Sequence, residues 1–185
     1  MKKLIMLILA GLILMSLAYA DEIEEQKFPQ PRFEKRPGFL VMGIEAEDAL
    51  EGDTMMALWM DFFKIQPTIP EPVGEAIYGI TYYGDDYDPQ TMKGYKYLVG
   101  MEVAVEVKLP EGLVMHKVPD GYYAVFEHRG PIEKINATYE YIFGGWILDS
   151  GYKSAPQDVF EVYDARFKQD SDASVMEIWV PVIAP

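Results

Sequence analysis

The order of the elements predicted along this chain repeats, and the repeat restricts the possible folds strongly. In the first half, residues 39–44 and 76–83 are apolar runs typical of strands, and residues 53–65 between them have a helical apolar period. A further long strand follows over residues 95–107, with Gly100 inside it. The first half therefore predicts strand, helix, strand, strand.

The second half predicts the same order. A strand over residues 121–128 is followed by a helix that runs from Pro131 to a stop near Gly151, and then by strands over 159–167 and 175–183. The halves share little residue identity, so the duplication is inferred from element order. We expect an α+β domain made of two β-α-β-β units.

Both helices are predicted from apolar residues at helical spacing. Asp53 is placed to cap the first helix, and Pro131 stands where the first position of the second would be. The apolar residues are Met56, Trp59, Met60 and Phe63 in the first helix, and Ile135, Tyr139, Ile142 and Trp146 in the second.

Residues 1–20 match a secretory signal peptide. Two lysines precede an apolar or small run over residues 4–18, and Ala18-Tyr19-Ala20 stands before an acidic segment. We expect cleavage after Ala20 and a secreted, periplasmic or cell-envelope location. The alternative is an uncleaved membrane anchor, because the run approaches the roughly 17 residues that can span a bilayer.

Residues 21–37 are charged and contain three prolines, so we expect an extended leader there and a domain over residues 38–185. The chain after Ala20 keeps all 30 acidic residues and 14 of the 16 basic ones, a formal charge of −16. Such a field repels nucleic acid and concentrates cations. With no cysteine and two histidines, we expect neither a disulfide nor a metal ion or cofactor.

Side-chain alternation points to a candidate site on the last two strands. Glu161 and Tyr163 share one face of their strand, and Glu177 and Trp179 share one face of theirs. If these strands are antiparallel neighbours in a suitable register, the two acids and two rings converge. The alternative is the ordinary half-polar, solvent-facing side of a sheet.

A carboxylate inside an aromatic cavity would select a particular ligand. Desolvating the acid costs several kcal/mol unless a cation or donors compensate it, and ring faces attract cations by about 0.5–2 kcal/mol. A lipophilic cation meets both needs. Further candidates for the lining of this cavity are Trp146, Tyr82 and Tyr97. For the two tyrosines, ordinary packing in a strand is the alternative, because strands favour tyrosine.

Several segments of this chain resemble the GyrI-like effector-binding domain, the small-molecule module of AraC-type and MerR-type multidrug regulators and of gyrase-inhibitory proteins. The resemblance covers about residues 37–184. The second-half segments are Pro119–Gly130, Trp146–Tyr152, Phe160-Glu161-Val162-Tyr163 and Glu177–Val182, and the first-half segments are Phe39–Ile44, Ala76–Ile80 and Tyr95–Val103.

The resemblance implies a pseudo-two-fold axis between the two units, an antiparallel sheet, and a central ligand cleft between two helices. It also implies lipophilic, often cationic aromatic ligands held around a buried glutamate, which maps onto Glu161. The acid and the ring of the last strand map onto Glu177 and Trp179. A signal peptide stands where the regulators carry a helix-turn-helix, which disfavours a transcriptional or gyrase-directed role.

We therefore predict an extracytoplasmic protein that binds a lipophilic cation, with Glu161 as countercharge, and that is more a binder than an enzyme. A hydrolase is the first alternative, because some relatives hydrolyse strained cyclopropane-bearing toxins, and Glu161 would then be the general base. The second alternative is a cell-envelope interaction module whose cleft is filled by its own side chains.

Overall fold

The computed structural model describes residues 28–185 except 50–52, 89, 92 and 105–108. The predicted signal peptide and residues 21–27 of the predicted leader lie outside the described residues. Within the described part of the chain, no helix has the length and apolar character to cross a membrane.

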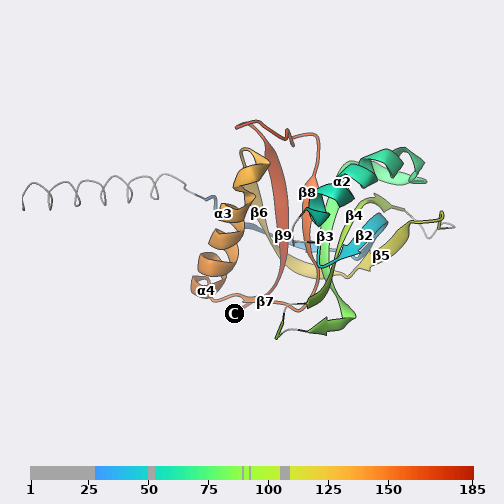
Figure 1. Ribbon diagram of the computed structural model, residues 1–185. Coiled ribbons are helices and arrows are strands. Elements are labelled where there is room, and N and C mark those ends of the chain that lie inside the picture. The colour runs from blue at the N-terminus through green and yellow to red at the C-terminus, as the bar shows by residue number, and fades with distance from the viewer. Residues whose placement is uncertain (1–27, 50–52, 89, 92, 105–108) are drawn as a thin grey trace, which may run out of the picture.

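The strands and helices follow the predicted order in both halves (Figure 1). The first half contains β2 (Phe39–Glu47), α2 (Thr54–Ile65), the 3-10 turn η1 (Gln66–Thr68), β3 (Pro72–Asp88) and β4 (Lys93–Val103). The second contains β6 (Gly121–Arg129), the 3-10 turn η2 (Ile132–Lys134), α3 (Ile135–Tyr139), the π-helical segment η3 (Glu140–Trp146), α4 (Ile147–Asp149), β8 (Val159–Tyr163) and β9 (Val175–Ile183).

Three short strands were not predicted: β1 (Arg32–Arg36), β5 (Val114–Val118) and β7 (Lys153–Ser154). The prediction of an extended leader over residues 21–37 is wrong at β1, which pairs antiparallel with β6. The charged composition of this segment is typical of a linker, but Arg32 forms a salt bridge with Glu177 and Arg36 forms one with Glu102. Asp53 precedes α2 without donating or accepting a side-chain capping hydrogen bond.

The strands form an antiparallel sheet in the order β1-β6-β9-β8-β3-β4-β2-β5, and β7 pairs with β9. From the central β8–β3 pair, the second half continues outward as β9 and β6, and the first half as β4 and β2. β1 precedes the first unit but pairs with the second, and β5 precedes the second but pairs with the first. The duplicated α+β fold is confirmed, with each unit extended by one exchanged edge strand.

The sheet is strongly curled. Phe39 of β2 lies three strands from Phe160 of β8, a separation of about 14 Å in a flat sheet. Their ring centroids are nevertheless 5.5 Å apart. Tyr123 of β6 approaches the same Phe160 ring from the other side, at 5.2 Å. The two halves of the sheet therefore fold toward each other around one aromatic cluster.

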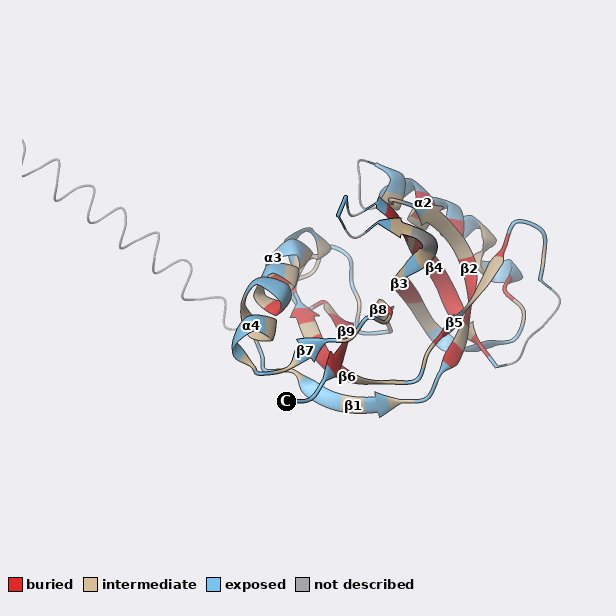
Figure 2. Cartoon of the chain, turned by 90° about the horizontal axis from the view of Figure 1, so that it is seen from below, coloured by how far each residue is buried: buried red, intermediate tan, exposed pale blue. Residues whose placement is uncertain are grey.

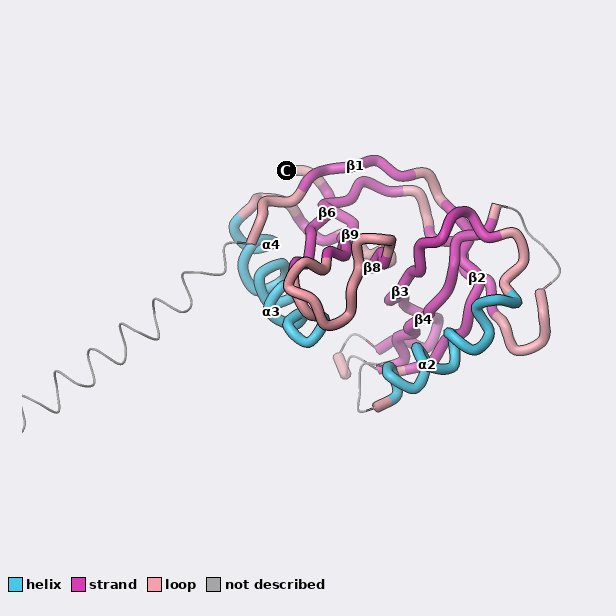
Figure 3. Tube along the Cα trace, turned by 90° about the horizontal axis from the view of Figure 1, so that it is seen from above, coloured by secondary structure: helices cyan, strands magenta, loops and turns pink. Residues whose placement is uncertain are grey.

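The sheet has two unlike faces. The inner face of the curl is packed with its own side chains, including Val41, Ile80, Phe160 and Trp179, and no helix residue belongs to that cluster among the described residues. The other face, which we call the helix face, carries two clusters. They are covered by α2, through Leu58 and Phe62, and by η3, through Ile142. Figures 2 and 3 show the helices beside different halves of the sheet, on either side of β3 and β8.

One glycine pair permits a close approach within the first half. Gly43 of β2 stands directly opposite Gly100 of β4. A Cβ at residue 43 would lie 1.9 Å from the carbonyl oxygen of Val99, and one at residue 100 would lie 2.5 Å from that of Met42. Gly100, noted inside the predicted strand, is therefore required by backbone packing.

Candidate functional site

The helix face carries a buried carboxylate at the join between the two halves. Glu161 lies in β8 and is 7% exposed. Tyr97 donates a hydrogen bond to its Oε2 at 2.8 Å, Tyr163 donates to Oε2 at 2.9 Å, and Tyr139 donates to Oε1 at 2.6 Å. We call Glu161 and these three tyrosines the Glu161 cluster.

The cluster is assembled from both halves of the chain. Tyr163 follows Glu161 by two residues in β8, so the pleat places both side chains on the helix face. Tyr97 comes from β4 of the first half, and Tyr139 from the last residue of α3. The structure thus brings together the predicted residues Glu161, Tyr163 and Tyr97.

A glycine makes room for the cluster. Gly79 of β3 is the direct cross-strand partner of Glu161. A Cβ at this position would lie 2.2 Å from the Tyr97 hydroxyl oxygen and 2.7 Å from Glu161 Oε2. The hydrogen bond between Tyr97 and Glu161 therefore occupies the space that a side chain at residue 79 would take.

Aromatic rings from both helical regions surround the cluster. Trp59 of α2 lies edge-on to Tyr163, with 4.8 Å between ring centroids. Phe143 of η3 stacks on Tyr139 at 6.2 Å, and Phe167 meets Tyr163 at 4.9 Å. The carboxylate is therefore held in an aromatic environment with neutral hydrogen-bond donors.

Glu161 differs from the other buried acids in its partners. Among the described residues, the buried acids are Asp158, Glu161 and Glu177. Asp158 pairs with His116 at 2.7 Å, and Glu177 pairs with two arginines. In the part of the chain that the structure describes, no lysine or arginine forms a salt bridge with Glu161. Its hydrogen-bond partners in the described part of the chain are phenolic hydroxyls, and the charge interaction with His128 is the smallest of the effects that act on its pKa.

Burial raises the pKa of Glu161 above the ordinary value of 4.5, and the hydrogen bonds from Tyr139, Tyr97 and Tyr163 offset only part of that effect. Burial and the nearby carboxylate in turn raise the pKa of all three tyrosines well above 10.0. The hydroxyls are therefore neutral donors, and the carboxylate gains from any positive charge that approaches it.

The predicted convergence of Glu161 with Glu177 and Trp179 is wrong. β8 and β9 are antiparallel neighbours, but Glu161 stands opposite Ile178, and Val162 stands opposite Glu177. Side chains of directly paired residues share a face, so Glu177 and Trp179 lie on the inner face, behind the sheet from Glu161. The register differs by one residue from the one that convergence requires.

Glu177 is part of a filled network on that inner face. Arg32 of β1 contacts its Oε2 at 2.8 Å, Arg166 contacts its Oε1 at 2.6 Å, and Trp179 Nε1 donates to Oε2 at 3.0 Å. Burial acts to raise the pKa of Glu177, but the two arginines outweigh it and hold the pKa below the ordinary value.

Tyr82 also lies on the inner side of β3. Its ring stacks on His116 with 3.9 Å between centroids, and its hydroxyl donates a hydrogen bond to Glu45. Lys96 pairs with the same carboxylate at 2.8 Å. The structure therefore separates Tyr82 from the Glu161 cluster.

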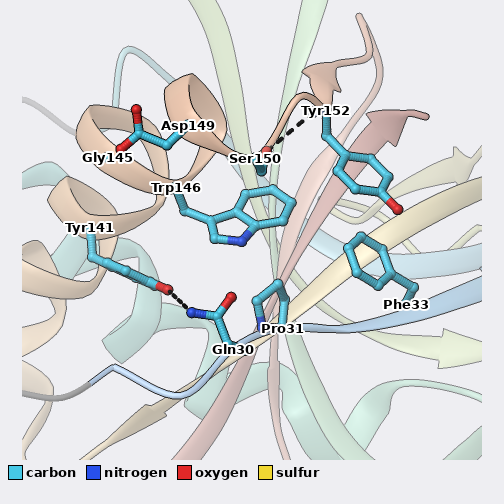
Figure 4. A pocket seen from close by; sticks show the side chains of 9 residues that line it. All are labelled: Gln30, Pro31, Phe33, Tyr141, Gly145, Trp146, Asp149, Ser150 and Tyr152. Carbon is cyan, nitrogen blue, oxygen red and sulfur yellow. Dashed lines mark hydrogen bonds between the residues drawn. The ribbon is translucent and has the colours of Figure 1, made fainter. Parts of the chain in front are cut away.

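Trp146 lines a different hollow. A groove of about 590 Å³ runs between α4 and the segment that leads into β1 (Figure 4). It shares no residue with the Glu161 cluster. Its lining residues are Gln30, Pro31, Phe33, Tyr141, Gly145, Trp146, Asp149, Ser150 and Tyr152. Trp146 packs against the same helix-face cluster as Tyr139, but its ring contacts are Phe33, Phe126 and Tyr152, and none of these belongs to the Glu161 cluster.

Sequence reasoning missed the site roles of Tyr139, Gly79 and Trp59. The helical spacing identified Tyr139 and Trp59 only as apolar residues. Their O–H and N–H groups usually find hydrogen-bond partners when buried, and this was the available signal. Gly79 had the clearer signal, a glycine inside a strand, which marks close approach of another group. Among the described residues, no cluster of three or more acidic or histidine side chains gathers as a metal would require.

Gly79→Ala tests the geometry of the cluster. The added methyl group has to push Tyr97 off Glu161, so we expect a loss of about 1–3 kcal/mol in the free energy of unfolding, measured by urea denaturation. Gly84→Ala is the matched control in the same strand, because the nearest atom to its Cβ is 3.7 Å away. Equal stability of the two variants would contradict the assignment.

The pH dependence of stability tests the charge of Glu161. Since its folded-state pKa lies above 4.5, the wild type should lose stability as the pH rises from 4.5 through that raised pKa. Glu161→Gln should lack this loss and be more stable than the wild type at neutral pH. The measurement is urea denaturation across this pH range, and coincident wild-type and variant curves would contradict the prediction.

Glu177→Gln is the control of opposite sign. The pKa of Glu177 is held below its ordinary value, so its carboxylate stabilises the fold above pH 4.5 and loses that contribution as the pH falls. This variant should lose about 2 kcal/mol at neutral pH, since hydrogen bonds to a charged group are lost.

Comparisons with known proteins identify relatives of this architecture. The transcriptional regulator BrlR of Pseudomonas aeruginosa is 31% identical over 155 residues, which are 82% of this chain and 54% of BrlR. The chain thus spans about half the length of that regulator. A DNA gyrase inhibitor of Cronobacter sakazakii is 24% identical over 151 residues, which are 80% of this chain and 90% of the inhibitor.

The fold recurs in a solved structure with a ligand. The structure of SAV2435 bound to tetraphenylphosphonium matches with a TM-score of 0.66 and 14% identity, over 84% of this chain and 94% of SAV2435. A family model described as a GyrI-like small molecule binding domain matches residues 29–183, so its boundary includes β1. This chain therefore belongs to the family of GyrI-like small-molecule-binding domains.

Proposed function

We propose that this domain binds a lipophilic, cationic aromatic molecule at the Glu161 cluster. The observation that carries the proposal is a buried carboxylate whose described partners are three neutral hydroxyls, in a structure that pairs its other buried acids with bases. A ligand cation would supply the missing countercharge. The surrounding rings would contribute contact area and cation–π attraction.

The relatives support the ligand class. SAV2435 carries tetraphenylphosphonium, a cation surrounded by four aromatic rings, on the same fold. In this chain, Trp59 and Phe143 come from opposite helical regions and flank the tyrosines that hold Glu161. An aromatic cation that separates these rings would meet apolar surface on two sides and the carboxylate at the sheet.

Binding of two ions of like shape and opposite charge tests this proposal. Isothermal titration calorimetry should show that tetraphenylphosphonium binds the wild type and that tetraphenylborate does not. Glu161→Gln should weaken phosphonium binding at least about tenfold, which corresponds to about 1.4 kcal/mol of lost charge interaction. Glu140→Gln, an exposed acid next to Tyr139, is the control for the bulk negative charge and should leave the affinity unchanged. Equal affinities in wild type and Glu161→Gln would reject Glu161 as the countercharge.

A hydrolase of strained electrophiles is the second candidate, favoured by the raised pKa of Glu161. As a general base the carboxylate would accept a proton from the water that attacks the electrophile, and a pKa nearer neutrality improves that role. Turnover of a strained electrophile that Glu161→Gln abolishes would favour this function over simple binding.

We further propose that the domain acts outside the cytoplasm, on the basis of the signal-peptide pattern of residues 1–20. Fractionation of cells expressing the full chain should place the protein in the periplasm, cell envelope or medium. Amino-terminal sequencing should begin at Asp21. A cytoplasmic protein that retains its first 20 residues would contradict this location.

A further inference from the structure

The inner face of the sheet already holds a cation among aromatic rings. The guanidinium carbon of Arg36, from β1, lies 3.9 Å from the ring centroid of Phe39. The same carbon is 5.5 Å from the centroids of Tyr78 and Phe160 and 5.3 Å from that of Trp179. Four rings on four different strands thus surround one positive charge.

A carboxylate completes this arrangement. Arg36 Nη2 donates to Glu102 Oε2 at 2.8 Å and to the Tyr78 hydroxyl oxygen at 3.0 Å. Tyr78 in turn donates to the same Glu102 oxygen at 3.0 Å. The side chains of Arg36 and Glu102 are 21% and 22% exposed, so solvent screens this pair less than it screens an open surface pair. We call the four rings and Glu102 the inner cage.

None of the inner-cage residues belongs to β1, the strand that carries Arg36. The rings of the cage come from β2, β3, β8 and β9, and Glu102 comes from β4. Arg36 comes from β1, an edge strand of five residues that pairs only with β6 among the described strands. Replacing Arg36 therefore changes no residue of the cage itself.

We propose that the inner cage is a second binding site, specific for a guanidinium or amidinium group, which Arg36 fills from within the chain. A planar, weakly hydrated cation can stack on Phe39 while its N–H groups reach Glu102 and Tyr78, whereas a compact ammonium cannot do both. A soluble guanidinium compound occupies the cage when Arg36 is removed or withdrawn. The site lies on the opposite face from Glu161 and shares no residue with the Glu161 cluster.

Chemical rescue of an emptied cage tests the proposal. Arg36→Ala should lower the melting temperature, and millimolar methylguanidinium should restore part of that loss in a saturable way. Calorimetry should show methylguanidinium binding to Arg36→Ala with a dissociation constant in the millimolar range, and at least tenfold weaker binding to the wild type. Urea, which has a similar shape and no charge, should not rescue the variant.

Two further variants establish where the rescue occurs. Adding Glu102→Gln to Arg36→Ala should abolish rescue, because the cage then lacks its countercharge. Lys35→Ala, at the neighbouring exposed position of β1, should gain nothing from methylguanidinium. Rescue that survives Glu102→Gln, or that is equal in Lys35→Ala, would overturn the proposal. Glu161→Gln should leave the rescue unchanged, so this test and the phosphonium test fail independently.

A measurement on the wild type covers the case in which Arg36→Ala does not fold. Methylguanidinium should then compete with Arg36, and hydrogen exchange of the amides of residues 32–36 should accelerate while that of the central strands stays constant. Urea at the same concentration should not produce this difference. Unchanged exchange in β1 would overturn the proposal, as would a folded Arg36→Met variant that binds no methylguanidinium.

Discussion

The antiparallel pair of β3 and β8 is the contact on which the rest of this structure depends. It joins the two β-α-β-β units, and it places Gly79 directly opposite Glu161. Because one residue has no side chain, the other can lie flat across the join and reach Tyr97 in the first half and Tyr139 in the second. The pair of Gly79 and Glu161 thus places the buried carboxylate where the two units of the fold meet.

Acidic side chains have different partners on the two faces of the sheet. On the inner face, Glu102 and Glu177 are paired with arginines, and most of that positive charge comes from the edge strand β1. On the helix face, Glu161 has only phenolic donors among the described residues, and burial raises its pKa. A buried acid without a basic partner costs stability. This cost at Glu161 is consistent with a site in which a ligand supplies the positive charge.

The sequence allowed the fold to be predicted more fully than the site. Element order, the two units and the shared face of Glu161 and Tyr163 follow from patterns within single strands and helices. The register between β8 and β9 does not, and a shift of one residue moves Glu177 and Trp179 to the opposite face. Trp146 was misplaced because its ring contacts Phe33 of β1 and Tyr152, and a pattern within the helix does not show these contacts with other segments. β1 was missed because its arginines pair with Glu102 and Glu177, which are distant in sequence, and a local pattern of charges does not reveal such pairs.

The alternation of adjacent residues explains how one sheet can carry both of the cation sites that we propose. Phe160 and Glu161 are neighbours in β8, and Tyr78 and Gly79 are neighbours in β3, yet each pair divides between the two faces. The inner cage and the Glu161 cluster therefore lie back to back, separated by the backbone of the same two strands. Arg32 and Arg36 lie on the inner face, because Arg32 pairs with the inner-face residue Val125 and Arg36 follows it by four residues in the same strand. No arginine of β1 pairs with the acid on the helix face, so the charge of Glu161 is available to the cationic ligand that we propose.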